Sequence, residues 1–139
     1  MMNKVFADTS GWASLFLEKD PYHAKASTII TQWQQQSQNV VTTNYVLSEL
    51  IVLLSSFRGQ QRLAILKFIE TIRSANWIEI VHVDEFLDEK AWQLLAKRLD
   101  KRWSLVDAVS FIVMEERGMT EALTADHHFE QAGFVRLLK

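Results

Sequence analysis

The sequence predicts an α/β protein, a three-layer α/β/α sandwich around a mainly parallel sheet of four to five strands. Short apolar runs alternate with amphipathic segments, which is the pattern of strands connected by helices. Four glycines and one proline are too few for the repeated turns of an all-β sandwich. The length of 139 residues and the 48% of hydrophobic side chains are typical of a single domain, residues 1–139.

The first elements are a strand and a helix. Lys4–Ala7 is short and apolar and ends at Asp8, which predicts a buried strand. Thr9 and Ser10 are good N-cap residues, so a helix is expected over Gly11–Leu17.

A second helix is expected to begin at Asp20-Pro21, because aspartate is a favoured N-cap and proline fits the first helical turn. Its apolar face consists of Ala26, Ile29, Ile30 and Trp33. The run Val40–Thr43 is β-branched throughout and predicts the second strand. Asn44 is then the expected cap of a helix over Tyr45–Ser56.

The second half of the chain repeats this alternation. Gln60–Arg73 is amphipathic and predicts a helix, and Trp77–Val83 predicts the third strand. The side chains expected to point inward from that helix are Leu63, Leu66, Ile69 and Ile72. The remaining elements are a helix from the cap Asp84 to Leu99, a helix from the cap Ser104 to near Arg117, and strands at Glu121–Thr124 and Val135–Leu138.

Composition and charge exclude several kinds of protein. There are no cysteines, which excludes disulfides, zinc–cysteine sites and thiol nucleophiles. The net charge of −2 gives no overall attraction for polyanions, so a nucleic acid partner would need local positive charge or metal ions. The apolar stretch Val5–Ala7 is too short for a signal peptide, and no run is long enough to span a bilayer. We therefore expect a cytoplasmic protein without membrane contact.

Four acidic residues are placed where they can meet. Asp8 and Asp126 follow predicted strands, and Glu49 and Asp107 lie early in helices that start on the same side of the sheet. Two such charges about 6 Å apart repel by roughly 3 kcal/mol at an effective dielectric near 20, so a cluster must hold protons or bind a cation. Oxygen ligands favour Mg²⁺ or Mn²⁺, and the natural chemistry is phosphodiester hydrolysis by a metal-activated water.

Each of these residues also has a purely structural interpretation. Asp8 could cap the following helix, and Asp107 could form a capping box with Ser104. Asp126 could cap a turn beginning at His127, and Glu49 could simply be exposed.

Four motifs, taken in order, resemble a known family. They are Phe6-Ala7-Asp8-Thr9-Ser10, Ser48-Glu49-Leu50, Ser104-Leu105-Val106-Asp107-Ala108 and Thr124-Ala125-Asp126-His127-His128-Phe129. Their order and spacing resemble the PIN domain, and within it the VapC-type ribonuclease toxins of toxin–antitoxin pairs. The resemblance extends over essentially the whole chain, although no single motif is specific.

The resemblance implies a PIN fold and Mg²⁺- or Mn²⁺-dependent cleavage of RNA. It implies an acidic quartet of Asp8, Glu49, Asp107 and Asp126, with Asp8 and Asp107 as first choices for metal contact. Thr9 and Ser104 match hydroxyl positions that orient the carboxylates or a water. The resemblance also implies a homodimer and an antitoxin that inserts a segment into the acidic groove. Two other functions remain open: a housekeeping PIN nuclease in RNA processing, and a non-catalytic module that binds RNA or protein.

A basic cluster precedes Ser104 and could contact RNA. It consists of Lys97, Arg98, Lys101 and Arg102, of which Lys101 and Arg102 are the candidate substrate contacts. Trp103 could stack on a base, but a core position is favoured, as it is for Trp12, Trp33, Trp77 and Trp92. Arg58 and Arg62 are weaker candidates for phosphate contact. His127 and His128 would point about 100° apart on a helix, which predicts a poor shared metal site.

Overall fold

The computed structural model describes residues 4–139, so residues 1–3 of the predicted domain lie outside the described part. The strands are β1 (Val5–Ala7), β2 (Val40–Thr43), β3 (Ile78–Val81), β4 (Glu121–Leu123) and β5 (Val135–Arg136). The helices are α1 (Thr9–Phe16), α2 (His23–Gln35), α3 (Asn44–Ser55), α4 (Arg62–Ser74), α5 (Glu85–Lys97), α6 (Leu105–Glu116) and α7 (His127–Gln131).

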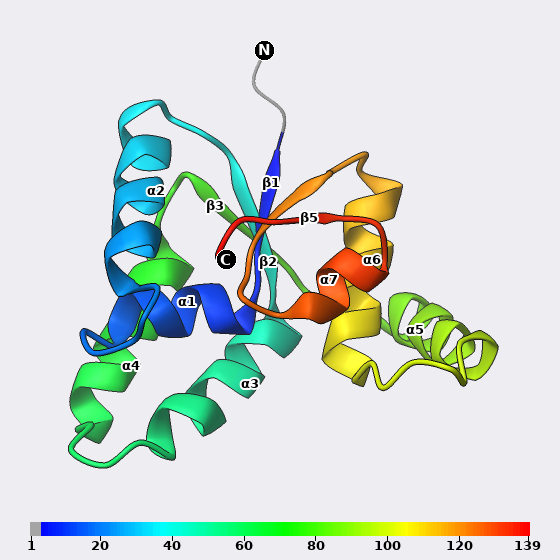
Figure 1. Ribbon diagram of the computed structural model, residues 1–139, viewed down its shortest axis with the longest axis horizontal. Coiled ribbons are helices and arrows are strands. Elements are labelled where there is room, and N and C mark those ends of the chain that lie inside the picture. Colours follow the sequence, from blue (N-terminus) through cyan, green and yellow to red (C-terminus); the bar gives the residue numbers. More distant parts are fainter. Residues whose placement is uncertain (1–3) are drawn as a thin grey trace.

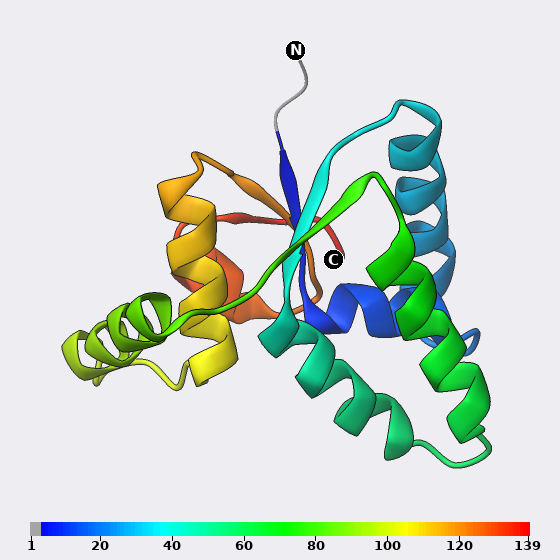
Figure 2. The same ribbon diagram turned by 180° about the vertical axis from the view of Figure 1, so that it is seen from behind.

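The strands form one five-stranded sheet in the order β3-β2-β1-β4-β5, and every neighbouring pair is parallel. Helices α1 to α4 lie on one side of the sheet and α5 to α7 on the other (Figures 1 and 2). This follows from right-handed crossovers: the chain moves outward from β1 to β3, then returns across the sheet to β4. The α/β class, the sandwich and the mainly parallel sheet are confirmed.

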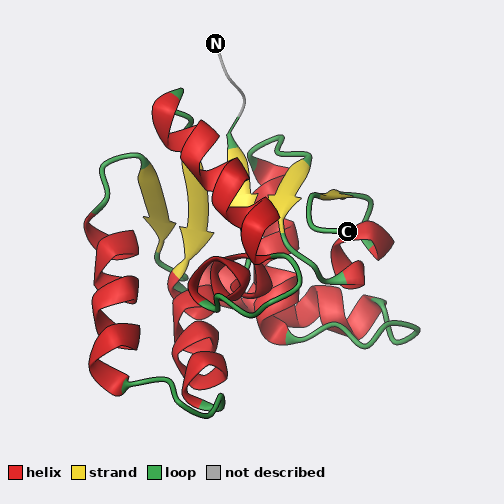
Figure 3. Ribbon diagram, turned by 60° about the vertical axis from the view of Figure 1, so that its left-hand side comes forward, coloured by secondary structure: helices red, strands yellow, loops and turns green. Residues whose placement is uncertain are grey.

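The strand order changes direction between β1 and β4, and this determines where a site can form. Parallel strands end at a common edge, toward which the arrowheads of the larger strands point in Figure 3. Between β1 and β4 the chain leaves toward opposite faces, and ligands of open α/β sheets bind outside the carboxyl ends of such strands. The backbone N–H of Asp8 donates to the Leu123 carbonyl (3.1 Å), which extends the β1–β4 pairing to this edge.

The core lies on both faces of the central strands. Phe6, Val41 and Leu123 are fully buried, as expected for parallel strands covered by helices on both sides. Two buried polar side chains of the core are paired: the Trp12 indole donates to the Thr42 hydroxyl (3.3 Å), which donates to the Ala7 carbonyl (2.8 Å). This chain of bonds ties α1 to both central strands.

Four predicted helix starts are wrong, and one of them is that of α4, which begins at Arg62 instead of Gln60. Helix α1 begins at Thr9, so its N-cap position is occupied by Asp8 and not by Thr9 or Ser10. Helix α2 begins at His23, because the Asp20 carboxylate accepts from the N–H of Tyr22 (2.8 Å) and closes a separate turn.

The predicted cap of α3 is also wrong by one residue. The Thr43 hydroxyl accepts from the N–H of Val46 (3.0 Å) and caps the helix. The Asn44 amide oxygen instead accepts from the N–H of Val83 (2.8 Å), which connects α3 to the end of β3. The predicted caps Asp84 and Ser104 are confirmed.

Three side chains that were predicted to lie in the core are exposed. Leu63 and Leu66 are 62% and 44% exposed, because a strict three-residue spacing drifts around a helix with 3.6 residues per turn. Helix α4 buries Ile65, Ile69 and Ile72. Trp92, predicted in the core, is 51% exposed on the outer side of α5.

Within residues 4–139, no helix is long and apolar enough to cross a membrane. This agrees with the absence of long apolar runs in the sequence.

The contact between α1 and β4 generates a prediction. A Cβ added to Gly11 would lie 2.1 Å from the carbonyl oxygen of Leu123, so only glycine fits there. We expect Gly11→Ala to lower the free energy of unfolding by about 3 kcal/mol. The control is Gly59→Ala, where the space is open and only the positive φ of +82° opposes alanine, at about 1–2 kcal/mol. Urea unfolding that shows no larger loss for Gly11→Ala than for Gly59→Ala contradicts this account.

Candidate active site

Asp8 lies at the carboxyl end of β1 and is 3% exposed. It occupies the N-cap position of α1 in an extended conformation, but its side chain makes no capping bond. Its Oδ2 accepts from the Thr124 hydroxyl (3.0 Å), and its buried Oδ1 has no hydrogen-bond partner among residues 4–139. The predicted capping function of the Asp8 side chain is therefore wrong, and one carboxylate oxygen is unpaired.

Burial dominates the electrostatics of Asp8. Desolvation raises the pKa of its carboxyl group to about 7, against the lowering effect of the nearby Thr9 backbone N–H, which does not reach the geometry of a full hydrogen bond. The negative charges of Asp107 and Glu49 raise the pKa further. The negative charge of an ionised Asp8 is therefore unfavourable unless the carboxylate binds a proton or a cation.

Asp107 lies in the first turn of α6 and is buried. Its Oδ2 accepts from the N–H of Ser104 (3.0 Å), and the Ser104 hydroxyl accepts from the N–H of Asp107 (3.0 Å). This reciprocal capping box confirms the structural interpretation of Asp107. The same Oδ2 lies 3.0 Å from Nδ1 of His128, so the residue also faces the site. Burial, followed by the charge of Asp126, raises the pKa of Asp107.

Asp126 follows β4 and caps α7, as the structural interpretation predicts. Its Oδ1 accepts from the N–H of His128 (2.9 Å), and its own N–H donates to the Thr124 hydroxyl (3.0 Å). The Thr124 hydroxyl is 3.0 Å from that of Ser10, so it links Asp8, Asp126 and α1.

Glu49 lies on the second turn of α3 and is half-buried, so it is not simply an exposed helix residue. Burial raises its pKa, as do the negative charges of Asp107 and Asp126. The Thr9 hydroxyl lowers this pKa but lacks the geometry of a full hydrogen bond, and its oxygen is buried without a partner.

The structure thus brings the four predicted carboxylates together, as the mutual effects on their pKa values require. We call Asp8, Glu49, Asp107 and Asp126 the carboxylate cluster. Its members come from the ends of β1 and β4 and from α3 and α6, which meet at the lower edge of the sheet in Figure 1.

The residues present fit a hard divalent cation. Two buried oxygens, Asp8 Oδ1 and Thr9 Oγ1, lack partners at this edge, and an unpaired buried polar atom is costly. Mg²⁺ is bound by carboxylate oxygens of this kind and tends to retain several waters. Asp8 and Asp107 would hold the ion directly, with Glu49 and Asp126 beside them.

Three residues of this network were not predicted as site residues. Ser10, Thr124 and His128 each bond to a member of the cluster or to its scaffold. Thr124 and His128 flank Asp126 in the last motif, which was the available signal for them.

The predicted geometry of the histidine pair is wrong. The imidazole centroids of His127 and His128 are 4.6 Å apart, and Nδ1 of each ring lies within 3.6 Å of Asp126 Oδ1. Both rings therefore lie near the carboxylate of Asp126, which caps α7.

The basic cluster is only partly free. Arg98 and Lys101 pair with Asp100 at 3.1 and 3.7 Å, and Arg98 also stacks over Trp103 at 5.0 Å. Trp103 is 8% exposed and donates to Gln131 (3.0 Å), so it is a core residue, as favoured, and cannot stack on a base. Arg102 is exposed, and within residues 4–139 it forms no ion pair.

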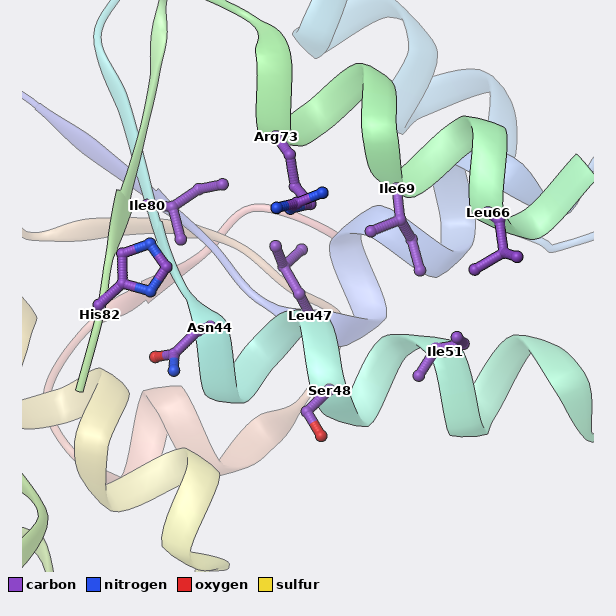
Figure 4. Close-up of a pocket in the computed structure, with 9 residues that line it drawn as sticks. All are labelled: Asn44, Leu47, Ser48, Ile51, Leu66, Ile69, Arg73, Ile80 and His82. Carbon is purple, nitrogen blue, oxygen red and sulfur yellow. The ribbon is translucent and has the colours of Figure 1, made fainter. Parts of the chain in front are cut away.

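A separate pocket of about 370 Å³ lies between α3, α4 and β3 (Figure 4). In Figure 4, Ile51 of α3 lies opposite Ile69 and Leu66 of α4, Leu47 lies opposite Arg73, and His82 lies at the end beside β3. None of its lining residues belongs to the carboxylate cluster, so it is not the place for metal chemistry.

Comparisons with known proteins agree with the geometry. A family model described as the PIN domain matches residues 5–135. The "23S rRNA-specific endonuclease VapC20" of Mycobacterium tuberculosis is 35% identical over 133 residues, which cover 96% of this chain and 97% of that protein. A "VapC ribonuclease" of Archaeoglobus fulgidus is 26% identical over 111 residues, covering 78% of this chain and 69% of that protein.

Solved structures show the same fold. The crystal structure of Mycobacterium tuberculosis VapC20, described as a "Sarcin-Ricin loop cleaving toxin", has a TM-score of 0.83 at 34% identity and covers 94% of this chain and 96% of that chain. FitAcB from Neisseria gonorrhoeae has a TM-score of 0.63 at 14% identity, covers 95% of this chain and 94% of that chain, and shows the fold alone.

The raised pKa of Asp8 predicts how stability depends on pH. Between the ordinary value of 3.8 and the folded value of about 7, the folded state keeps a proton that the unfolded chain releases. The metal-free protein should therefore lose stability as the pH rises through this window. The contribution of Asp8 to this loss of unfolding free energy is on the order of 4 kcal/mol, since one pKa unit corresponds to about 1.36 kcal/mol. Asp8→Asn should remove that contribution.

The measurement is urea unfolding in the presence of a chelator, between about pH 4 and about pH 7. Glu115→Gln, an exposed carboxylate-to-amide change on α6, serves as the control. An Asp8→Asn protein with the pH dependence of the wild type would show that Asp8 is not the titrating group.

Proposed function

The chain belongs to the PIN domain family and is a VapC-type ribonuclease, and from this premise we propose that it cleaves RNA with a divalent cation held by the carboxylate cluster. The observation that carries the proposal is Asp8 Oδ1, a buried oxygen without a partner among like charges. Mg²⁺ or Mn²⁺ is the proposed ion, because the cluster offers only oxygen ligands. We propose that residues 1–139 form one such domain.

The residues of the chain have distinct parts in this proposal. When bound, the ion neutralises charge on the phosphodiester and lowers the pKa of a water molecule. Asp8 and Asp107 bind it, while Thr124 and Ser104 fix the orientation of their carboxylates by the hydrogen bonds described above. Glu49 is half-buried and has a raised pKa, so it is suited to accept a proton from the attacking water.

The substrate is proposed from the relatives. VapC20 is named a 23S rRNA-specific endonuclease and a sarcin–ricin loop cleaving toxin, and the two chains align over almost their full lengths. We propose that this chain cleaves 23S rRNA at the sarcin–ricin loop. It would act in the cytoplasm, where ribosomes are.

The same relatives favour a toxin over a housekeeping nuclease or a non-catalytic module. We propose an antitoxin partner that covers the acidic groove, and a homodimer. The exposed apolar side chains Phe86, Trp92 and Leu99 in and after α5 supply a surface that a second copy could cover.

We expect Asp8→Asn and Asp107→Asn each to reduce cleavage of a synthetic sarcin–ricin hairpin by about 100-fold or more, because each removes a charge that binds the ion. An asparagine at position 107 can still accept from the N–H of Ser104, so the helix cap is kept. Cleavage is measured by gel electrophoresis with Mg²⁺ or Mn²⁺, and a chelator should abolish it.

The matched control is Asp84→Asn, which changes another helix-capping aspartate outside the cluster. It should cleave at the wild-type rate. If Asp8→Asn and Asp107→Asn also cleave at that rate, the assignment of the active site is wrong.

A second prediction concerns RNA binding. Arg102 is exposed beside the N-terminus of α6, where it can contact a phosphate. In an Asp8→Asn background, which prevents cleavage, Arg102→Gln should weaken hairpin binding and reduce the salt dependence of log K by about 0.7. Lys67→Gln, an exposed change on α4, should leave both unchanged in fluorescence anisotropy. Equal salt dependence in the two variants would remove Arg102 from the interface.

A further inference from the structure

The histidine pair beside the carboxylate cluster has no part in the function proposed above. One ligand atom each from Asp126, His127 and His128 lies within 4.8 Å of the other two. Nδ1 of His127 and Nδ1 of His128 are 3.6 and 3.4 Å from Asp126 Oδ1. Two nitrogens and one carboxylate oxygen therefore converge on one point.

Local structure holds these atoms in place. Asp126 is fixed because its Oδ1 caps α7 and its N–H bonds to Thr124. His128 is largely buried, with 21% of its side chain exposed, and Nδ1 is also 3.0 Å from Asp107 Oδ2. His127 is 65% exposed, so it can rotate to complete a site without disturbing the core.

The surroundings of His128 are rich in carboxylate oxygens. Its Nδ1 lies 3.0 Å from Asp107 Oδ2 and 3.4 Å from Asp126 Oδ1. A cation bound at this imidazole nitrogen would therefore also have carboxylate oxygens within reach.

The donor set selects the kind of ion. Imidazole nitrogen is a ligand of first-row transition ions, whereas Mg²⁺ prefers oxygen and retains its waters. Asp8 and Glu49 provide only oxygen, so the two ends of the site differ in the ligands they offer.

We propose that Asp126, His127 and His128 form a second cation position that binds a first-row divalent transition ion, such as Mn²⁺, in preference to Mg²⁺. The proposal rests on the function proposed above, because Asp126 is shared with the carboxylate cluster. It assigns to the histidines direct contact with an ion, which the family resemblance does not require.

The test uses the full chain loaded with Mn²⁺ and electron spin-echo spectroscopy, which detects nitrogen bound directly to Mn²⁺. The wild type should show imidazole nitrogen coupling, and His127→Gln with His128→Gln should abolish it. Mn²⁺ affinity, measured from the signal of the free ion, should fall by at least about 10-fold to 100-fold, while Mg²⁺ affinity by calorimetry is unchanged. His82→Gln, which changes a histidine in the separate pocket, should behave as the wild type.

Several outcomes overturn the proposal. The proposal is wrong if the wild type binds Mn²⁺ but shows no nitrogen coupling. It is also wrong if the double variant keeps the coupling. If the double variant fails to fold, His127→Gln alone carries the test, because this side chain is exposed, and it should reduce the coupling. The proposed function is tested separately. If the wild type shows no nitrogen coupling but its cleavage of RNA is still abolished by a chelator and by Asp8→Asn, only the second cation position is overturned. A wild type that binds no divalent ion overturns both.

Discussion

The repulsion among buried carboxylates is the constraint on which the site depends. Desolvation raises the pKa of Asp8, Glu49 and Asp107, and each negative charge opposes ionisation of its neighbours. The topology imposes this arrangement, because parallel strands that end at one edge, with crossovers leaving on both faces, place the groups side by side. The close packing of Gly11 against Leu123 and the bond from Thr124 to Asp8 keep that edge in register.

Structural and chemical functions overlap in the same side chains. Asp107 completes a capping box and Asp126 caps α7, yet both belong to the carboxylate cluster. A carboxylate has two oxygens with about four lone-pair directions, so one hydrogen bond to a backbone N–H leaves room for another partner. The structural interpretations were thus correct for both residues without excluding a site. For Asp8 and Glu49 the two interpretations competed, and there the structural one is wrong: the Asp8 side chain does not cap, and Glu49 is half-buried.

The sequence was sufficient for the order of the elements, the parallel sheet and the meeting of four acidic residues, because these follow from periodicity and strand ends. It was not sufficient where tertiary contacts decide. Thr43 rather than Asn44 caps α3 since the Asn44 amide is used by Val83, a contact that local sequence cannot show. The inward face of α4 was misplaced because several leucine and isoleucine spacings fit a helix equally well before its neighbours are known. The rotation of His127 and His128 toward Asp126 depends on side-chain torsions, which carry no sequence pattern.

The capping box at the start of α6 bears on how such a protein can lose its activity through mutation. A cell harmed by an RNA-cutting enzyme gains from any change that silences it. Replacing Asp107 by a residue that accepts no hydrogen bond also removes one of the two bonds of the capping box, the one from the N–H of Ser104, so the chain loses some helical stability together with catalysis. At Glu49, half-buried and without a capping bond, silencing leaves the architecture intact. Inactive descendants that still fold, and still engage a partner, should therefore carry their lesions at Glu49 more often than at Asp107.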